Sequence, residues 1–252
     1  MAALIAHRGA SADAPENTLA AFELAWRQGA DGIEGDFRLT RDGEIVCMHD
    51  ASTERTTGCA VAVAEATLAE LRRLDAGARK GAPWRGQRIP TLGEVLATVP
   101  EGKQVFIEIK CGPAIVPALE AALAASGLPA AQVVVMSFDA DVVRETKRRL
   151  PQLGVLWLTG FSTRPTSGVR PSAAEVVETL GAVGADGVGC SSHRAVDRAF
   201  VQTLRNAGKA VHVWTVDDVP TAARYLQLGV DSITSNRAGW LKQQLGIEPA
   251  TR

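Results

Sequence analysis

The sequence predicts an α/β protein folded as a (β/α)8 TIM barrel, and two observations carry this prediction. First, eight apolar stretches of strand length alternate with helical stretches along 252 residues, which is the size and rhythm of such a barrel. Second, one pattern occurs three times, at residues 28–33, 183–188 and 228–233: a helix ends, a glycine follows, and Ala or Val and then Asp lead into a strand. Stacked strand–helix units leave such a repeat, although a doubly wound open sheet is the alternative topology.

The individual elements follow from apolar stretches and from residues that start and stop helices. Strands are expected at residues 3–7, 32–38, 104–110, 132–137, 153–159, 187–191, 210–216 and 231–235. Helices are expected at residues 17–28, 91–98, 114–126, 139–150, 172–183, 196–207, 218–228 and 237–245. Helix starts are indicated by Asn17, Asp139, Pro171-Ser172 and Asp217-Asp218, and helix ends by Gly29, Gly127, Gly208 and Gly229.

Residues 39–90 interrupt the strand–helix rhythm. They are expected to contain a hairpin around Arg41-Asp42-Gly43, a helix near residues 67–74 and a loop rich in Gly, Arg and Lys at residues 77–88. We expect an insertion after the second strand, on the face at which the C-terminal ends of the barrel strands lie. There it can shape the choice of a bound molecule or act as a lid. The whole chain, residues 1–252, is then a single domain with this one small insertion.

Composition excludes several classes of function. The net charge is −1, so neither nucleic acid nor an anionic membrane is favoured as a partner. The four cysteines, Cys47, Cys59, Cys111 and Cys190, lack the close spacing of zinc or redox motifs. No apolar run approaches the roughly 18 residues of a transmembrane helix, and the apolar start of the chain is too short for a signal peptide. We therefore expect a reduced, cytoplasmic protein without stable membrane association.

Charged residues and histidines gather at the ends of the first three expected barrel strands and just after the hairpin that follows the second of them. This set consists of His7, Arg8, Glu34, Asp36, His49, Glu108 and Lys110. Catalytic residues of (β/α)8 barrels lie at the C-terminal ends of the strands, and burying unpaired charges is costly, so packing alone does not explain the set. Its members suggest a metal-assisted reaction on an anionic substrate.

The spacing within the strands predicts that the acidic side chains converge. Glu34 and Asp36 are two residues apart and point to the same side of their strand, as do Glu108 and Lys110 on the next barrel strand. If that side is the barrel interior, the three carboxylates converge. Three carboxylates directed into the barrel form an all-oxygen site suited to one divalent cation, Mg²⁺ or Ca²⁺. The alternative is that they form rim salt bridges with Arg38, Arg41 or Lys103.

The histidines and the cations complete the chemistry expected at this site. His7 and His49 adjoin the acidic cluster, and a pair of imidazoles can remove one proton and donate another. Arg8 and Lys110 can bind and neutralise phosphate oxygens. His193 and His212 are interpreted as structural, with a place beside the site left open for His193.

Several motifs together resemble glycerophosphodiester phosphodiesterases, over nearly the whole chain. In order, they are His7-Arg8-Gly9, Pro15-Glu16-Asn17-Thr18, Gly29-Ala30-Asp31, Ile33-Glu34-Gly35-Asp36, Thr40-Arg41-Asp42-Gly43, His49-Asp50, Ile89-Pro90-Thr91-Leu92, Glu108-Ile109-Lys110, Ser137-Phe138 and Val213-Trp214-Thr215-Val216. The chain is most similar to the bacterial, cytoplasmic single-domain type. Two positions depart from the family's pattern: Gly35 replaces a bulkier apolar residue, and the last strand ends in Thr234-Ser235-Asn236.

The resemblance implies a role for each site residue. His7 and His49 would be the catalytic acid/base pair, and Glu34, Asp36 and Glu108 would bind one divalent metal ion. Arg8 and Lys110 would bind the phosphate. Trp214 would form a pocket wall, with a core tryptophan as the alternative.

The resemblance also implies an activity: metal-dependent hydrolysis of glycerophosphodiesters, such as glycerophosphocholine and glycerophosphoethanolamine, to sn-glycerol 3-phosphate and an alcohol. The partner is then a small-molecule phosphodiester, and a homo-oligomer is left open. The nearest alternative is a lysophospholipase D-like or sphingomyelinase D-like enzyme acting on lipids. A barrel that only binds phosphodiesters and a xylose-isomerase-like metal barrel acting on sugars are further alternatives. The acid/base pair argues against the former, and Arg8 with Lys110 against the latter.

Overall fold

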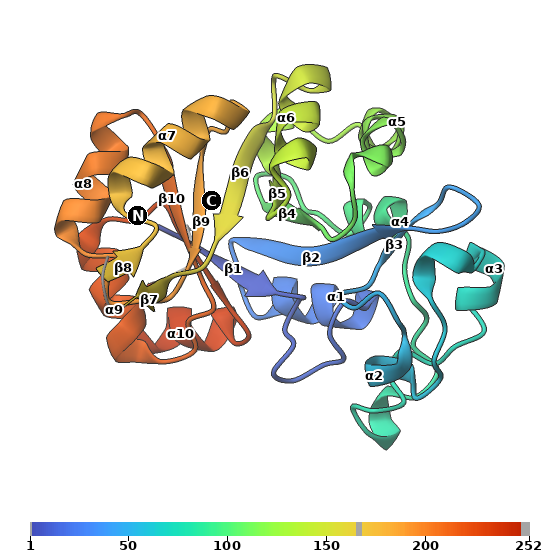
Figure 1. Cartoon of the computed structure of the whole chain (residues 1–252). Coiled ribbons are helices and arrows are strands. Elements are labelled where there is room, and N and C mark those ends of the chain that lie inside the picture. Colours follow the sequence, from blue (N-terminus) through green and yellow to red (C-terminus); the bar gives the residue numbers. More distant parts are fainter. Residues whose placement is uncertain (1, 165–167, 248–252) are drawn as a thin grey trace.

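A computed structural model describes residues 2–164 and 168–247, which form a closed barrel of parallel strands (Figure 1). The barrel strands are β1 (Ala3–His7), β2 (Gly32–Leu39), β4 (Gln104–Ile109), β5 (Val133–Ser137), β6 (Gly154–Thr159), β9 (Gly187–Ser191), β10 (Ala210–Trp214) and β11 (Ser232–Ser235). Each pairs with the next in this order, and β1 closes the ring by pairing with both β11 and β2. The predicted TIM barrel is confirmed, and the open sheet is not formed.

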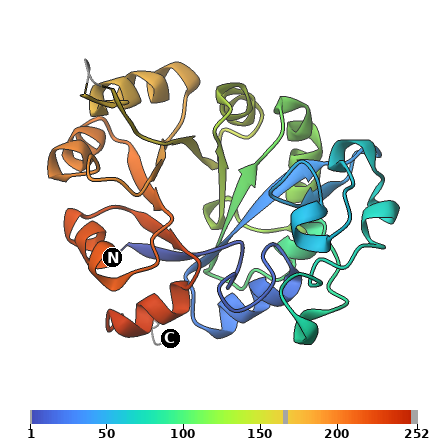
Figure 2. The same cartoon turned by 60° about the horizontal axis from the view of Figure 1, so that its bottom comes forward.

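The helices form an outer ring around the strands (Figure 2). They are α1 (Leu19–Arg27), α4 (Leu92–Leu96), α5 (Val116–Ser126), α6 (Ala140–Arg149), α7 (Ala173–Val183), α8 (Arg198–Asn206), α9 (Val219–Leu228) and α10 (Ala238–Gln244). Asp139, Ser172 and Asp218 cap α6, α7 and α9 with their side chains, as expected. The prediction that Asn17 starts this helix as its N-cap is wrong. Thr18 caps α1, because the Asn17 side-chain amide instead donates a hydrogen bond to Asp36 on β2.

Alternation along the strands sorts their side chains into two layers. On β4, Val105, Ile107 and Ile109 belong to the large core between the strands and the helices, whereas Phe106 belongs to a smaller core inside the barrel. Glu108 shares the parity of Phe106, so it points inward. On β2, a Cβ at Gly35 would lie 3.1 Å from the Phe22 ring on α1, which places Gly35 on the outer side and its neighbours Glu34 and Asp36 on the inner side.

The chain between β2 and β4 forms an extra lobe beside the barrel (Figure 1). It contains β3 (Ile45–Cys47), which runs antiparallel to β2, and the short helices α2 (Glu54–Thr57) and α3 (Leu68–Leu71). This lobe has an apolar core of its own, made by Val46, Met48, Val63, Ala66, Leu71, Ala76 and Ile89. The helix expected near residues 67–74 is α3, which begins with a capping box from Thr67 to Glu70 and ends sooner than predicted.

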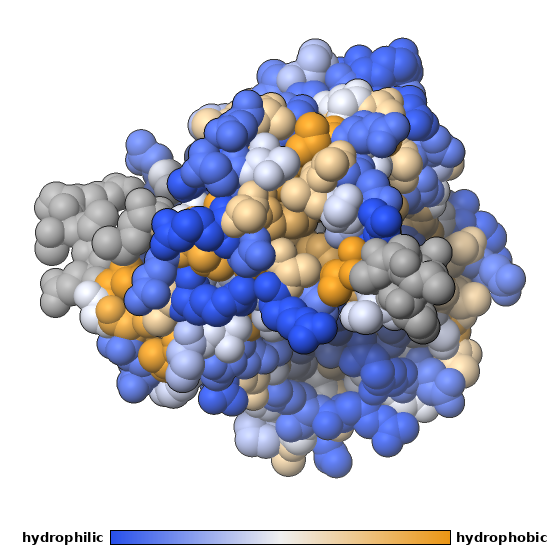
Figure 3. All heavy atoms as spheres, turned by 60° about the vertical axis from the view of Figure 1, so that its left-hand side comes forward, coloured by the Kyte–Doolittle hydropathy of each residue, from blue (hydrophilic) through white to orange (hydrophobic). Residues whose placement is uncertain are grey.

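Two features of the fold were not predicted. A small antiparallel pair of strands, β7 (Ser162–Arg164) with β8 (Gly168–Arg170), follows β6, and α2 lies in a polar stretch for which no helix or strand was expected. Elements of three or four residues are too short to show a hydrophobic period. Within the described residues, none of the helices is both long and apolar enough to span a bilayer, and hydrophilic residues dominate the face in Figure 3.

Candidate active site

A cavity of about 210 Å³ opens at the C-terminal ends of the barrel strands. Its lining includes seven of the eight predicted site residues: His7, Arg8, Glu34, His49, Glu108, Lys110 and Trp214. The eighth, Asp36, is fully buried beneath the lining and pairs with both cations of the site, Arg8 and Lys110. The structure therefore brings the whole predicted set together in one place.

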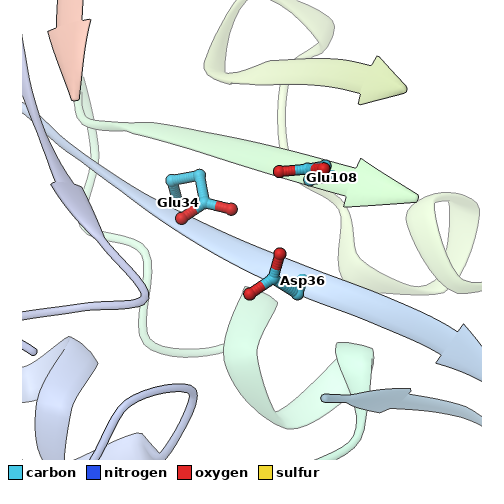
Figure 4. Close-up of side chains that lie close together, drawn as sticks. All are labelled: Glu34, Asp36 and Glu108. Carbon is cyan, nitrogen blue, oxygen red and sulfur yellow. The ribbon is translucent and has the colours of Figure 1, made fainter. Parts of the chain in front are cut away.

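The three carboxylates lie on adjacent strands with their oxygens directed toward one another (Figure 4). Asp36 on β2 is in register with Glu108 on β4, and Glu34 stands one side-chain repeat earlier on β2. One oxygen from each lies within 4.8 Å of the others. Glu34 Oε2 accepts the Arg8 backbone N–H at 2.9 Å, whereas Glu34 Oε1 is buried without a hydrogen-bond partner among the described residues.

Burial and mutual repulsion disfavour full ionisation of this cluster. Burial, followed by the charges of Asp36 and Glu108, raises the pKa of Glu34 well above its ordinary value. Burial and the charge of Asp36 also raise the pKa of Glu108. Burial acts in the same direction on Asp36, but Arg8 and Lys110 outweigh it and lower the pKa of this carboxyl. Three buried carboxylates with an unpaired oxygen and only two cations fit a bound divalent cation.

For the metal-free protein we expect the contribution of Glu34 to the free energy of unfolding to decrease as pH rises. The folded-state pKa of Glu34 lies above its ordinary value of 4.5, so the folded protein holds a proton that the unfolded chain has released. The stability linked to this proton is fully present below the unfolded pKa and is lost as pH rises through the folded pKa. Urea unfolding of EDTA-treated protein between about pH 5 and pH 8 measures it.

Glu34→Gln serves as the comparison for that measurement, because it removes the titrating group and keeps its volume. The free energy of unfolding of the wild type minus that of this variant is expected to decrease over the same pH interval, because all other titrating groups are common to both proteins. Added divalent cation should stabilise the wild type selectively. Identical pH slopes for the two proteins would show that Glu34 ionises normally in the folded state.

His7 ends β1, and a side chain after β11 fixes its ring. Asn236 Nδ2 donates to Asp217 Oδ2 at 2.6 Å, so Asn236 Oδ1 is directed to His7 Nδ1 at 2.8 Å. Since an amide oxygen only accepts, His7 Nδ1 carries the hydrogen and His7 Nε2, which lies 4.0 Å from Glu34 Oε2, is free to accept a proton. Burial, with the neighbouring charge of Arg8, lowers the pKa of His7 and keeps the ring neutral.

His49 follows β3 in the inserted lobe and is held at both its backbone and its ring. Arg38 on β2 donates to the His49 carbonyl from Nε at 3.0 Å and from Nη2 at 2.8 Å. His49 Nδ1 lies 2.7 Å from Asp50 Oδ1. Since a carboxylate only accepts, Nδ1 carries the hydrogen, and Nε2 is left for the pocket.

The two cations are anchored on the acidic residues around them. Arg8 lies in the left-handed region with a φ of 54°, and its Nη1 donates to Glu16 at 2.9 Å while its Nε lies 3.0 Å from Asp36. Gly9 completes this turn, where a Cβ would come within 2.5 Å of the Ala21 backbone. Lys110 Nζ lies 2.5 Å from Glu108 and 3.3 Å from Asp36.

Aromatic and apolar side chains complete the cavity. Trp214, at the end of β10, packs edge-on against Phe138 with ring centroids 5.6 Å apart, and it lies at the pocket wall. His212 is buried in the floor between Ser232 and Thr234, and burial lowers its pKa to about 3. His193 does not line this cavity and stacks on Phe161.

The rim salt bridges proposed as an alternative are not the pairs that form. Arg38 binds the His49 carbonyl, Arg41 pairs with Glu70, and Lys103 pairs with Asp31. The sequence did not indicate which polar residues hold the site residues in place: Glu16, Asn17, Asp50, Arg55, Asp217 and Asn236. Asn17 and Asp217 were expected only at the starts of helices. Glu16, Asn17 and Asp50 stand within the quoted motifs, whereas nothing in the spacing of Arg55 connects it with the site.

The fold and this arrangement define a TIM-barrel enzyme with an acidic centre flanked by histidines and basic side chains. A family model described as "Glycerophosphoryl diester phosphodiesterase family" matches residues 7–239. The chain belongs to this family and is a phosphodiester hydrolase, so the resemblance found in its motifs is confirmed.

Similar proteins agree over nearly the full length. A glycerophosphodiester phosphodiesterase from Caldanaerobacter subterraneus subsp. tengcongensis is 34% identical over 239 residues, covering 92% of this chain and 93% of the relative. One from Bacillus subtilis is 31% identical, covering 92% and 82%. The structure of an Oleispira antarctica phosphodiesterase in complex with the product sn-glycerol-3-phosphate matches with a TM-score of 0.83 and 28% identity, covering 97% of this chain and 96% of the other.

Proposed function

We propose that this protein hydrolyses glycerophosphodiesters such as glycerophosphocholine and glycerophosphoethanolamine to sn-glycerol 3-phosphate and an alcohol. One observation carries the proposal: two imidazoles, an acidic triad and two cations line or underlie a single cavity in a chain of this family. The similar Oleispira protein is described with sn-glycerol-3-phosphate as its product.

Glu34, Asp36 and Glu108 would hold one divalent cation, Mg²⁺ or Ca²⁺. Their ligand atoms are all oxygens, which suits both ions, and Glu34 Oε1 lacks another partner among the described residues. When bound, the cation would polarise a phosphoryl oxygen and acidify an attacking hydroxyl.

His7 is the general base in this proposal. Its Nε2 accepts the proton of the attacking hydroxyl, which belongs to water or to the substrate's glycerol 2-position. The Asn236 hydrogen bond supports this role because it leaves Nε2 as the accepting nitrogen.

His49 is the general acid. Its Nε2 donates a proton to the leaving alkoxide, and the Asp50 carboxylate at Nδ1 orients the ring for that transfer.

Arg8 and Lys110 bind the phosphate and stabilise the charge that develops on its oxygens. Both line the cavity, and Arg8 Nη2 is the guanidinium nitrogen that the contacts with Glu16 and Asp36 leave for a phosphate oxygen. Trp214 contacts the organic part of the substrate; its indole N–H is buried without a hydrogen-bond partner among the described residues.

A lysophospholipase D-like activity is the less favoured candidate. A lipid substrate needs an apolar surface for its acyl chain, and Phe138 and Trp240 are the large hydrophobic side chains that the described part of the chain exposes. The similar proteins are also named for glycerophosphodiesters. The interpretation of residues 1–252 as a single domain, the cytoplasmic location and the oligomeric state stay predictions.

We expect the protein to release glycerol 3-phosphate from glycerophosphocholine and to release little or no choline from lysophosphatidylcholine. The measurement follows both products in parallel at equal substrate concentration, with the lysolipid below and above its micelle-forming concentration. Faster turnover of the lysolipid in either state would favour the lipid enzyme instead.

A further inference from the structure

Arg55, in the inserted lobe, binds two carboxylates at the site. One of them contacts His49, the proposed general acid, and the other contacts Arg8, the proposed phosphate-binding residue. Arg55, in α2, donates from Nη1 and Nη2 to the two oxygens of Glu16, each at 2.7 Å, and from Nε to Asp50 Oδ2 at 2.6 Å. Glu16 lies in the loop after β1, and Asp50 directly follows His49. A guanidinium that donates on both of its edges to two carboxylates holds them in a fixed relative position.

Arg55 reaches His49 through Asp50, and we call this set of contacts the branch to His49. Asp50 uses one carboxylate oxygen for Arg55 and the other for His49 Nδ1, at 2.6 and 2.7 Å. The His49 side chain is 32% exposed and follows a three-residue strand outside the barrel. Its ring therefore depends on the Asp50 contact for its orientation, and Asp50 depends on Arg55.

Arg55 reaches Arg8 through Glu16, and these contacts form the branch to Arg8. Glu16 Oε1 accepts from Arg55 Nη2 at 2.7 Å and from Arg8 Nη1 at 2.9 Å. Burial raises the pKa of Glu16, but the hydrogen bonds and charges of Arg55 and Arg8 outweigh it, so the carboxyl stays ionised between them. The guanidinium of Arg8 is thus held by Glu16 on one side and by Asp36 on the other.

We propose that Arg55 is a positioning residue that orients His49 through Asp50 and Arg8 through Glu16, and so sets the inserted lobe against the barrel for catalysis. The inference rests on the proposed function, because it assigns Arg55 to that reaction. Arg55 is itself 47% exposed, and exposed ion pairs contribute little to stability. Its removal should therefore affect turnover and substrate binding far more than folding.

The test is a pair of double-mutant cycles on glycerophosphocholine hydrolysis at saturating metal, with kcat, KM and the melting temperature measured for each variant. We expect Arg55→Met to lower kcat by about 10–100-fold and to raise KM by about 3–10-fold. In the Asp50→Asn background the same change should lower kcat by less than about 3-fold, because the branch to His49 is already broken. In the Glu16→Gln background it should still lower kcat but no longer raise KM.

Arg41→Met is the matched control, because Arg41 pairs with Glu70 in the same lobe at 3.3 Å, and both its parameters should stay within about 2-fold of wild type. Arg55→Lys keeps the positive charge but lacks the bidentate guanidinium, and its kcat should lie between those of Arg55→Met and the wild type. If the methionine variant does not fold, Arg55→Lys replaces it in the cycles. Unchanged kcat and KM in both Arg55 variants, or full additivity with Asp50→Asn and Glu16→Gln, would overturn the inference. Absence of hydrolysis by the wild type would instead overturn the proposed function, and the inference with it.

Discussion

His7→Ala and His49→Ala are each expected to lower kcat for glycerophosphocholine by about 10²–10⁴-fold, the usual contribution of one acid or base group. His7 Nε2 is the only nitrogen of its ring left free by Asn236, and His49 Nε2 is the only one left free by Asp50. Neither side chain belongs to the apolar clusters that hold the barrel together. Folding and metal binding should therefore persist in both variants.

His193→Ala is the matched control, since this ring stacks on Phe161 and lies outside the lining of the cavity. It should retain wild-type kcat. If the His7 or the His49 variant kept full kcat while remaining folded, the role given to that histidine would be wrong.

Glu34→Gln is expected to lower kcat by on the order of 10²–10³-fold, because weakening metal binding removes several kcal/mol of transition-state stabilisation. The same change should leave the metal-free protein at least as stable near neutral pH, because it removes a buried carboxyl whose ionisation Asp36 and Glu108 oppose. Activity would then fall while stability stays the same or rises. A variant with a damaged fold would instead lose both activity and stability.

The measurements are kcat as a function of Mg²⁺ or Ca²⁺ concentration and urea unfolding after EDTA treatment. Glu44→Gln is the control, because Glu44 is exposed on the hairpin of the inserted lobe. Wild-type activity and metal response in the Glu34 variant would remove Glu34 from the metal site.

The barrel and the acidic cluster were predictable because both depend on regular repeats in the sequence: the alternation of side chains along a strand and the succession of strand–helix units. The period of two on β2 and β4 places Glu34, Asp36 and Glu108 on the inner side, and the register of the parallel strands sets Asp36 beside Glu108. The same period directs position 35 to the outer side of β2, where a Cβ would lie 3.1 Å from the Phe22 ring and away from the carboxylates.

The supporting contacts between distant segments could not be predicted, because the relative position of those segments depends on the closed barrel. Asn236 reaches His7 only because β11 pairs with β1, more than two hundred residues away in the sequence. Asn17 has the chemistry of a helix cap, yet the proximity of Asp36 gives its amide a buried carboxylate partner, and Thr18 caps the helix instead.

We propose that this protein is a metal-dependent glycerophosphodiester phosphodiesterase whose cation is held by Glu34, Asp36 and Glu108. The most direct measurement incubates EDTA-stripped protein with glycerophosphocholine and couples glycerol 3-phosphate release to its dehydrogenase, with and without Mg²⁺ or Ca²⁺. We expect release to appear only when one of these cations is added. Equal release by the stripped protein would contradict the metal assignment, and no release with either cation would contradict the proposed substrate.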